Sequence, residues 1–151
     1  MKINNIVIAG VIQDDSNIKY QRNYDRPPYM KIYKTKDYTL VAFKKSRKCR
    51  IMGKKITQAL PFKLCERRLQ TMSASHNLKK CLNLRQISKC FKQLDHKVEY
   101  EPEIFPAIRL RTFDPVCVNL FSSGKVTLLG LKTEKQGHDI IKRVEEGVNF
   151  V

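Results

Sequence analysis

One spacing of proline and phenylalanine occurs twice in this chain and limits how it can fold. Pro28 is followed by Phe43 after fifteen positions, and Pro106 is followed by Phe121 after the same interval. Both intervals hold short β-branched and apolar runs separated by polar turns, the pattern of antiparallel strands. Repetition at a fixed spacing is typical of a fold built from two copies of one unit. Two unrelated meanders of similar pattern are the alternative.

An alignment of the two copies without gaps brings Gly53 close to Gly130. The same alignment pairs residues of the preceding strand: Met30 with Ile108, Lys31 with Arg109 and Ile32 with Leu110. Upstream the copies differ, because Asn5 lies 23 positions before Pro28 whereas Thr71 lies 35 positions before Pro106. We therefore expect an abbreviated first repeat at residues 1–66, without a crossing helix, and a full second repeat at residues 67–151.

The hydrophobic pattern predicts strands in both halves of the chain. In the first half they are expected at residues 1–13, 29–34, 38–43 and 48–52, with a loop at 14–28. In the second half they are expected at residues 69–75, 107–112, 116–121 and 126–129.

Two helices are expected in the second half. Residues 83–94 place Leu84, Ile87, Phe91 and Leu94 on one apolar face, and Thr133 with Gln136 forms a capping box that opens the other helix. Residues 54–68 remain open, because Pro61 either begins a short helix at 62–68 or ends one that starts at Lys55.

The charge of the chain indicates a polyanionic partner. Thirty Lys and Arg stand against 14 Asp and Glu, which gives a net charge of +16. An excess this large suits nucleic acid. A merely basic surface is the alternative.

Residue types that support catalysis or metal binding show no usable pattern. The five cysteines are odd in number and lack a Cys-x-x-Cys pair, which argues against disulfides and zinc and for a reducing compartment. The three histidines lack metal-ligand spacing, and no catalytic triad or carboxylate pair stands out. No signal sequence or membrane-length apolar run is present. We expect a soluble intracellular protein, not an enzyme, with no cofactor, metal or membrane.

The second copy carries motifs of a known family. Tyr100-Glu-Pro-Glu-Ile-Phe-Pro-Ala-Ile, then Phe121-Ser-Ser-Gly-Lys and then Leu129-Gly130, resemble one repeat of the TATA-box-binding protein family. The resemblance covers residues 69–146 well and 2–55 loosely. It implies an α+β saddle of two βαββββα-type repeats, whose curved antiparallel sheet sits on the DNA minor groove. It also implies helices on the convex side that face other transcription factors.

The resemblance implies that aromatic rings wedge between base steps. Phe105 and Phe121 match the wedges of the second repeat, and Phe43 matches one wedge of the first. Pro27 stands at the place of the remaining ring. Core packing is the alternative role for each phenylalanine.

The residues that would face the floor of the groove depart from the family pattern. Asn5 and Val7 keep the family's Asn-x-Val, whereas Thr71 and Ser73 replace it in the second copy. The threonines that the family places before the closing glycines are also missing, and Met52 and Leu129 stand there. Fewer hydrogen-bonding groups then face the bases, so we expect affinity to rest on phosphate contacts and DNA deformability.

Basic residues are expected along the rim for phosphate. A run without acids follows Phe43, from which we assign Lys44, Lys45, Arg47 and Lys48 to DNA, with Arg50, Lys54 and Lys55 in the same run. Arg111 and Lys125 match basic residues of the family's second repeat. Solvated charge is the alternative.

The resemblance places Glu101, Glu103 and Ile104 in a loop that contacts a transcription factor IIB-like protein. The expected function is therefore a transcription factor that bends duplex DNA through its minor groove and recruits a IIB-like factor and RNA polymerase, in the nucleus or, for a fast-evolving viral lineage, a viral replication compartment. The alternatives are an architectural DNA- or RNA-binding module without promoter selectivity, or an accessory domain of a nucleic-acid enzyme. The sequence leaves the oligomeric state open.

Overall fold

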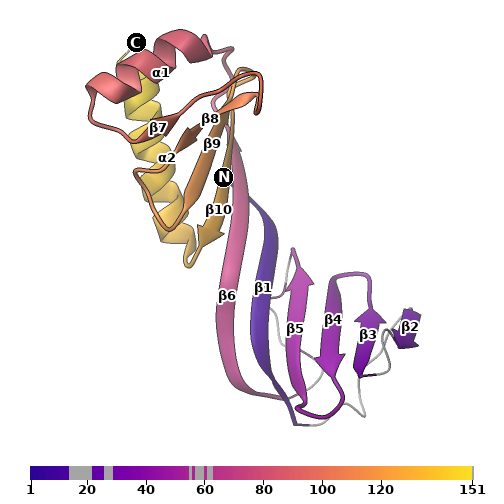
Figure 1. The fold of residues 1–151 in the computed structure, drawn as a ribbon. Coiled ribbons are helices and arrows are strands. Elements are labelled where there is room, and N and C mark those ends of the chain that lie inside the picture. The colour runs from indigo at the N-terminus through magenta and orange to yellow at the C-terminus, as the bar shows by residue number, and fades with distance from the viewer. Residues whose placement is uncertain (14–21, 26–28, 55, 57–59, 61–62, 151) are drawn as a thin grey trace. The chain divides into compact units, whose positions relative to one another are not determined.

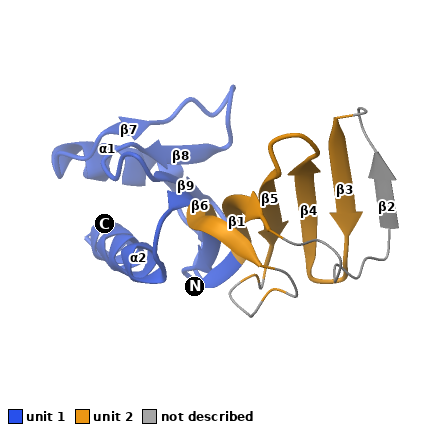
Figure 2. Cartoon of the chain, turned by 90° about the horizontal axis from the view of Figure 1, so that it is seen from below, with its two compact units in different colours: residues 1–3, 73–151 blue, residues 4–72 orange. Residues whose placement is uncertain are grey.

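The computed structural model describes residues 1–13, 22–25, 29–54, 56, 60 and 63–150. The chain forms two compact units (Figure 2). Unit 1 comprises Met1–Ile3 and Ser73–Val151, and unit 2 comprises Asn4–Met72. Two long strands, β1 (Lys2–Ile12) and β6 (Leu64–Asn77), contribute residues to both units.

Unit 2 is an antiparallel sheet (Figure 1). Besides β1 and the first part of β6, it contains β2 (Arg22–Asp25), β3 (Met30–Lys34), β4 (Tyr38–Phe43) and β5 (Lys48–Gly53). The spatial order is β2-β3-β4-β5-β1-β6. The described part of unit 2 contains no helix.

Unit 1 adds two helices to its sheet. Its elements after β6 are α1 (Leu84–Gln93), β7 (Val98–Glu99), β8 (Ala107–Leu110), β9 (Cys117–Phe121), β10 (Lys125–Leu131) and α2 (Glu134–Asn149). The spatial order is β6-β10-β9-β8-β7. Strands β1 to β5 of unit 2 therefore follow the same order as β6 to β10 of unit 1.

The strand register corrects the alignment of the two copies. Leu40 lies opposite Tyr33 in unit 2, and its counterpart Val118 lies opposite Leu110 in unit 1. The β8–β9 hairpin is thus one residue longer than the β3–β4 hairpin. The counterpart of Leu110 is therefore Tyr33 and not Ile32, and the expected matches of Met30 with Ile108 and of Lys31 with Arg109 are wrong by one position in the same way.

The ends of the two meanders correspond as the sequence alignment predicted, with Gly53 at the place of Gly130. Leu40 lies opposite Ile51, and Val118 lies opposite Leu128. Gly53 and Gly130 each follow two residues later. The same register makes Lys48 and Lys125, each at the start of its strand, counterparts.

The observed elements differ from the sequence predictions in three places. Arg22–Asp25 pairs with β3 through its backbone, although residues 14–28 were expected to be a loop. Strand β6 begins at Leu64, which excludes a helix over 64–68. The short strand β7 was not expected.

Local signals explain both helices of unit 1. Asn83 caps α1 by accepting a hydrogen bond from the Gln86 amide at 3.3 Å, and Leu84, Ile87 and Phe91 are buried. Leu94, expected on that apolar face, is the C-cap and is 39% exposed.

The Thr133 side chain caps α2 at 3.1 Å from the Gln136 amide, and Gln136 Oε1 accepts from the Lys132 amide at 2.9 Å. The capping box therefore forms, with its return bond one residue earlier than in the standard motif.

Each sheet buries one face and leaves the other open. In β1 the residues Ile6, Ile8, Gly10 and Ile12 are buried while their neighbours are only half-buried, as the two-residue period of a strand requires. In unit 1 the helices contact one side of the sheet. The core there comprises Ile108, Leu110, Val118, Leu120, Val126 and Leu128 from the strands, with Phe91, Ile141 and Val144 from the helices.

Candidate nucleic-acid interface

The open face of unit 1 is defined by the strand register. Directly opposed residues share a face, so Ala107 shares one with Phe121, Asn119 with Arg109 and Thr127, and Leu129 with Cys117. We call this surface the open face of unit 1: Ala107, Arg109, Cys117, Asn119, Phe121, Lys125, Thr127 and Leu129.

Phe105 and Phe121 meet at one end of this face. Their ring centroids are 6.1 Å apart at an interplanar angle of 64°, an edge-to-face pair, and both residues are half-buried. The guanidinium carbon of Arg109 lies 4.2 Å from the centroid of Phe105. Ala107, between them in sequence, is only 1% exposed. The two predicted wedges are thus neighbours that are partly exposed and lie beside a cation.

A chain of hydrogen bonds crosses the middle of the same face. The Asn119 side-chain amide donates to Thr127 Oγ1 at 3.2 Å, and Cys117 Sγ donates to Asn119 Oδ1 at 3.7 Å. Asn119 is 7% exposed, and Thr127 is half-buried. Neither Asn119 nor Thr127 was singled out from the sequence, because their pairing depends on the register of β9 with β10.

The other predicted DNA-contacting residues of unit 1 lie on strands or at their ends. Lys125 is exposed at the start of β10, and Leu129 is 46% exposed near its end. Arg111 donates to Glu99 Oε1 at 3.2 Å, and this hydrogen bond, together with the carboxylate's charge, raises the pKa of Arg111. Ser73 is half-buried, next to buried Ala74.

The open face of unit 2 carries the predicted residues of the first copy together with Thr71 of the second copy. Asn5 and Val7 are half-buried and alternate with the buried isoleucines of β1. Phe43, at the end of β4, is 37% exposed. Thr71 is half-buried beside buried Met72. The prediction for Pro27 lies outside the described residues.

Arg50 distinguishes the two open faces. It is exposed on β5 opposite Val41, whereas the same register position in unit 1 pairs Thr127 with Asn119. In the sequence Arg50 belongs to the basic run. Lys48 and Arg50 alternate with buried Cys49, and this alternation was the sequence signal that Arg50 lies on a strand.

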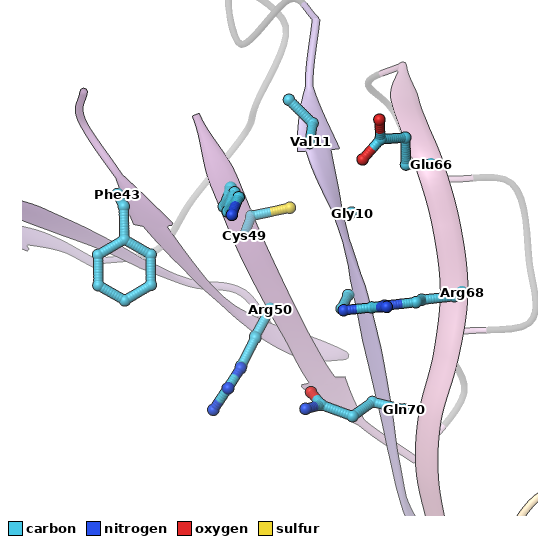
Figure 3. Close-up of a pocket in the computed structure, with 10 residues that line it drawn as sticks. Gly10, Val11, Phe43, Cys49, Arg50, Glu66, Arg68 and Gln70 are labelled. Carbon is cyan, nitrogen blue, oxygen red and sulfur yellow. The ribbon is translucent and has the colours of Figure 1, made fainter. Parts of the chain in front are cut away.

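Arg50 lines a hollow of about 400 Å³ on unit 2 (Figure 3). Phe43, Val11 and Lys48 are among its lining residues. Glu66, Arg68 and Gln70 line it from β6 (Figure 3). Arg68 was missed in the sequence because residues 62–68 were considered as a helix. Arg50 and Arg68 make this hollow basic, and the exposed Phe43 makes it partly apolar.

The basic turn between β4 and β5 combines two kinds of residue. Lys44, Lys45 and Lys48 are exposed. Arg47 instead donates from Nε to the Ile12 carbonyl at 2.9 Å and from a terminal nitrogen to the Gln13 carbonyl at 3.2 Å. These bonds tie the turn to the end of β1, so Arg47 has a structural role besides any contact with phosphate.

The predicted partner loop precedes β8. Glu101, Glu103 and Ile104 are all exposed, and Ile104 reaches 79%. The Glu101 carbonyl accepts from the amides of Ile104 and Phe105, both at 2.9 Å. This backbone turn carries the exposed Ile104, which lies in sequence between the two glutamates and Phe105.

Within the described ranges no group of three His, Cys, Asp or Glu could hold a metal ion. All five cysteines are free thiols, and burial raises the pKa of the Cys49 thiol to about 11. Among the helices of the described chain, none has the length and apolar character to cross a membrane.

TATA-box-binding proteins of archaea are among the curated proteins to which this chain is similar. The TATA-box-binding protein of Methanosphaera stadtmanae is 41% identical over 83 residues, which are 54% of this chain and 43% of the relative. That of Sulfurisphaera tokodaii is 38% identical over 77 residues, 50% of this chain and 37% of the relative. The matched part thus spans less than half the length of these relatives.

A solved structure extends the similarity to the whole fold. The structure described as Methanococcus jannaschii TBP has a TM-score of 0.73 and 26% identity, over 99% of this chain and 98% of that one. The expected α+β fold class of this family is thereby confirmed.

A family model settles the classification of the chain. The model described as "Transcription factor TFIID (or TATA-binding protein, TBP)" matches residues 66–149, more than half of the chain. Because this is a family of transcription factors, the expectation that the protein is not an enzyme is confirmed. The chain belongs to the TATA-box-binding protein family.

Proposed function

We propose that the protein is a TATA-box-binding transcription factor that contacts the minor groove of duplex DNA with the open faces of its two units and bends it. The observation that carries this proposal is the edge-to-face pair of Phe105 and Phe121, half-exposed on a helix-free face beside Arg109 and Lys125. Rings in the interior of a core would be fully buried. Rings placed at a rim, next to cations, suit insertion between base steps.

Charge supports DNA as the partner. The net charge of +16 favours phosphate contact and release of counterions. The open face of unit 1 and its edge hold one acid among the strand residues, Glu99, which is paired with Arg111. Inserting a ring costs a few kcal/mol of base stacking, and the larger protein surface against bent DNA offsets this cost.

The proposal includes recruitment of a IIB-like factor and RNA polymerase. Its support is the turn at Glu101–Ile104, which presents Ile104 and two carboxylates where they are free of strand pairing. In a chain this basic, an exposed acidic and apolar loop suits a protein surface better than DNA. The site of action is then the compartment that holds transcribed DNA, a nucleus or a viral replication compartment.

A binding selection tests the proposal. The protein is incubated with a random duplex library at several salt concentrations, and the enriched duplex is compared with scrambled duplex and with RNA of the same sequence. We expect enrichment of A·T-rich duplex and weaker binding of RNA. Equal binding of all three ligands would favour an architectural module without promoter selectivity, which the apolar Met52 and Leu129 on the open faces also fit.

A further inference from the structure

The open face of unit 1 contains one cross-strand pair of polar side chains with a defined direction. Asn119 on β9 lies directly opposite Thr127 on β10 and donates its side-chain N–H to Thr127 Oγ1 at 3.2 Å. The Asn119 oxygen in turn accepts from Cys117 Sγ at 3.7 Å. The amide is thereby held by a partner on each side.

This arrangement leaves the proton of the Thr127 hydroxyl available for a ligand. A hydroxyl has one donor and two acceptor lone pairs, and Asn119 occupies one lone pair. The proton of Thr127 therefore points away from the Asn119 amide. Asn119 is 7% exposed whereas Thr127 is half-buried, so the threonine is the member of the pair that can reach a ligand.

We propose that Thr127 determines base specificity by donating its hydroxyl proton to a minor-groove acceptor, and that Asn119 is its positioning residue. This inference rests on the proposed function. In the minor groove A·T pairs show only acceptors, whereas G·C pairs add the guanine N2 amino donor. The proton of Thr127 therefore favours A·T, where both bases offer acceptors, over G·C, where the guanine amino group lies in the groove.

Neither Leu129 nor the corresponding residues of unit 2 can take this role. Leu129, two residues later on the same face and 46% exposed, has no hydrogen-bonding side chain. In unit 2 the corresponding register position holds Val41 and Arg50, which lack a hydroxyl. The contribution of this hydroxyl is therefore expected only at base pairs beneath unit 1, which makes the recognised element asymmetric at that position.

The first test scans the duplex enriched by the full chain. Each A·T pair is replaced singly by G·C and by inosine·C, because inosine lacks the N2 amino group. We expect the wild type to prefer A·T and inosine·C over G·C by about 3- to 10-fold at one or two positions, the effect of one hydrogen bond. Thr127→Val should lose this preference there and keep it elsewhere, whereas Thr127→Ser should retain it.

The second test reverses the direction of the pair. A carboxylate only accepts, so in Asn119→Asp the Thr127 hydroxyl must donate inward and turn a lone pair outward. We expect the preference at the same position to shift towards G·C, in addition to a general loss of affinity from the added negative charge. A purely structural role of Asn119 would weaken all duplexes equally.

The outcomes separate this inference from the proposed function. Thermal unfolding confirms that each variant is folded, and if Asn119→Asp is not, the pair Thr127→Val and Thr127→Ser decides. An unchanged preference in Thr127→Val, or a wild-type preference for G·C at the position it affects, overturns the role of Thr127 alone. A wild type that enriches no duplex overturns the proposed function as well.

Discussion

Gly147 on α2 faces the ring of Phe91 on α1 with no room for a side chain between them. A β-carbon on Gly147 would lie 2.5 Å from Phe91 Cε1 and 2.9 Å from Cζ. Phe91 is completely buried, so its ring has little freedom to move. The close approach of the two helices in unit 1 depends on this glycine.

Gly147→Ala is predicted to destabilise unit 1. Alanine normally stabilises a helix by about 1 kcal/mol relative to glycine. Here the overlap with Phe91 costs about 1–3 kcal/mol, so we expect a net loss of up to about 2 kcal/mol in the free energy of unfolding. Gly137→Ala on the same helix is the control, because its β-carbon meets mainly the flexible end of Met1. Urea unfolding in which Gly147→Ala equals or exceeds Gly137→Ala in stability would contradict the close approach.

Acid is predicted to destabilise the protein through His96. Burial between Phe91 and Phe113, followed by the charge of Arg143, lowers the pKa of His96 in spite of nearby Asp95, and its Nδ1 lies 3.1 Å from Thr112 Oγ1. Because the pKa is lower in the folded state, the stabilisation is present above the unfolded value of about 6.5 and is lost as the pH falls through the lowered pKa.

The measurement is urea unfolding at pH 7.5 and 5.5. His96→Gln, which cannot be protonated, should lose less stability on acidification than the wild type. His138→Gln at an exposed position of α2 is the control and should behave as the wild type does. Equal losses in wild type and His96→Gln would exclude His96 as the acid-sensitive group.

Sequence predicted the elements whose signals are local. Strand β4 at residues 38–43 has the bounds that alternation gave, and α1 lies within the predicted range 83–94. Strand β2 could not be predicted, because Arg-Asn-Tyr-Asp has no alternation and its pairing is with the backbone of β3. The early start of β6 was hidden by Pro61 and by the charged residues Glu66–Arg68, which break the apolar pattern.

Individual residues of the candidate site could be predicted from the sequence, but the contacts between them could not. The motif matched Phe105 and Phe121, yet their edge-to-face contact needs the register of β8 with β9. The sequence did not reveal that register. The β8–β9 hairpin is one residue longer than the β3–β4 hairpin, and it contains Val116, a residue type typical of strands. The Asn119–Thr127 bond and the arginines of the unit 2 hollow depend on cross-strand geometry in the same way.

Binding is predicted to depend steeply on salt through the lysines of the β4–β5 turn. Changing Lys44, Lys45 and Lys48 to Gln should weaken all duplexes and flatten the slope of log affinity against log salt by up to about three units. Lys89, Lys92 and Lys135, exposed on the helices of unit 1, are the matched set and should leave the slope nearly unchanged when replaced by Gln. A slope that responds equally to both sets would remove the turn from the interface.

Arg47→Gln should behave differently from the lysines. The substitution removes the hydrogen bonds from the guanidinium to the Ile12 and Gln13 carbonyls. We therefore expect a clear loss in the free energy of unfolding and a smaller effect on the slope of log affinity against log salt.

The loop at Glu101–Ile104 is predicted to bind a protein. Glu101→Arg combined with Glu103→Arg should abolish the ternary complex with a IIB-like factor and leave affinity for bare DNA equal or higher, because carboxylates near phosphate repel it. A ternary gel shift measures both quantities. Ile104→Ala, which keeps the charges, should weaken the same complex. An undiminished ternary complex in the double variant would remove the loop from that interface.

The most direct test of DNA bending by Phe105 and Phe121 is fluorescence transfer between the ends of a labelled duplex that carries the selected element. The wild type should raise the transfer, and Phe105→Ala with Phe121→Ala should return it towards the unbent value while thermal unfolding changes little, because both rings are only half-buried. Core residues of this size would cost about 3–5 kcal/mol of stability on truncation. A wild type that binds the duplex without raising the transfer, or a double variant that unfolds, would contradict the role of these rings as wedges.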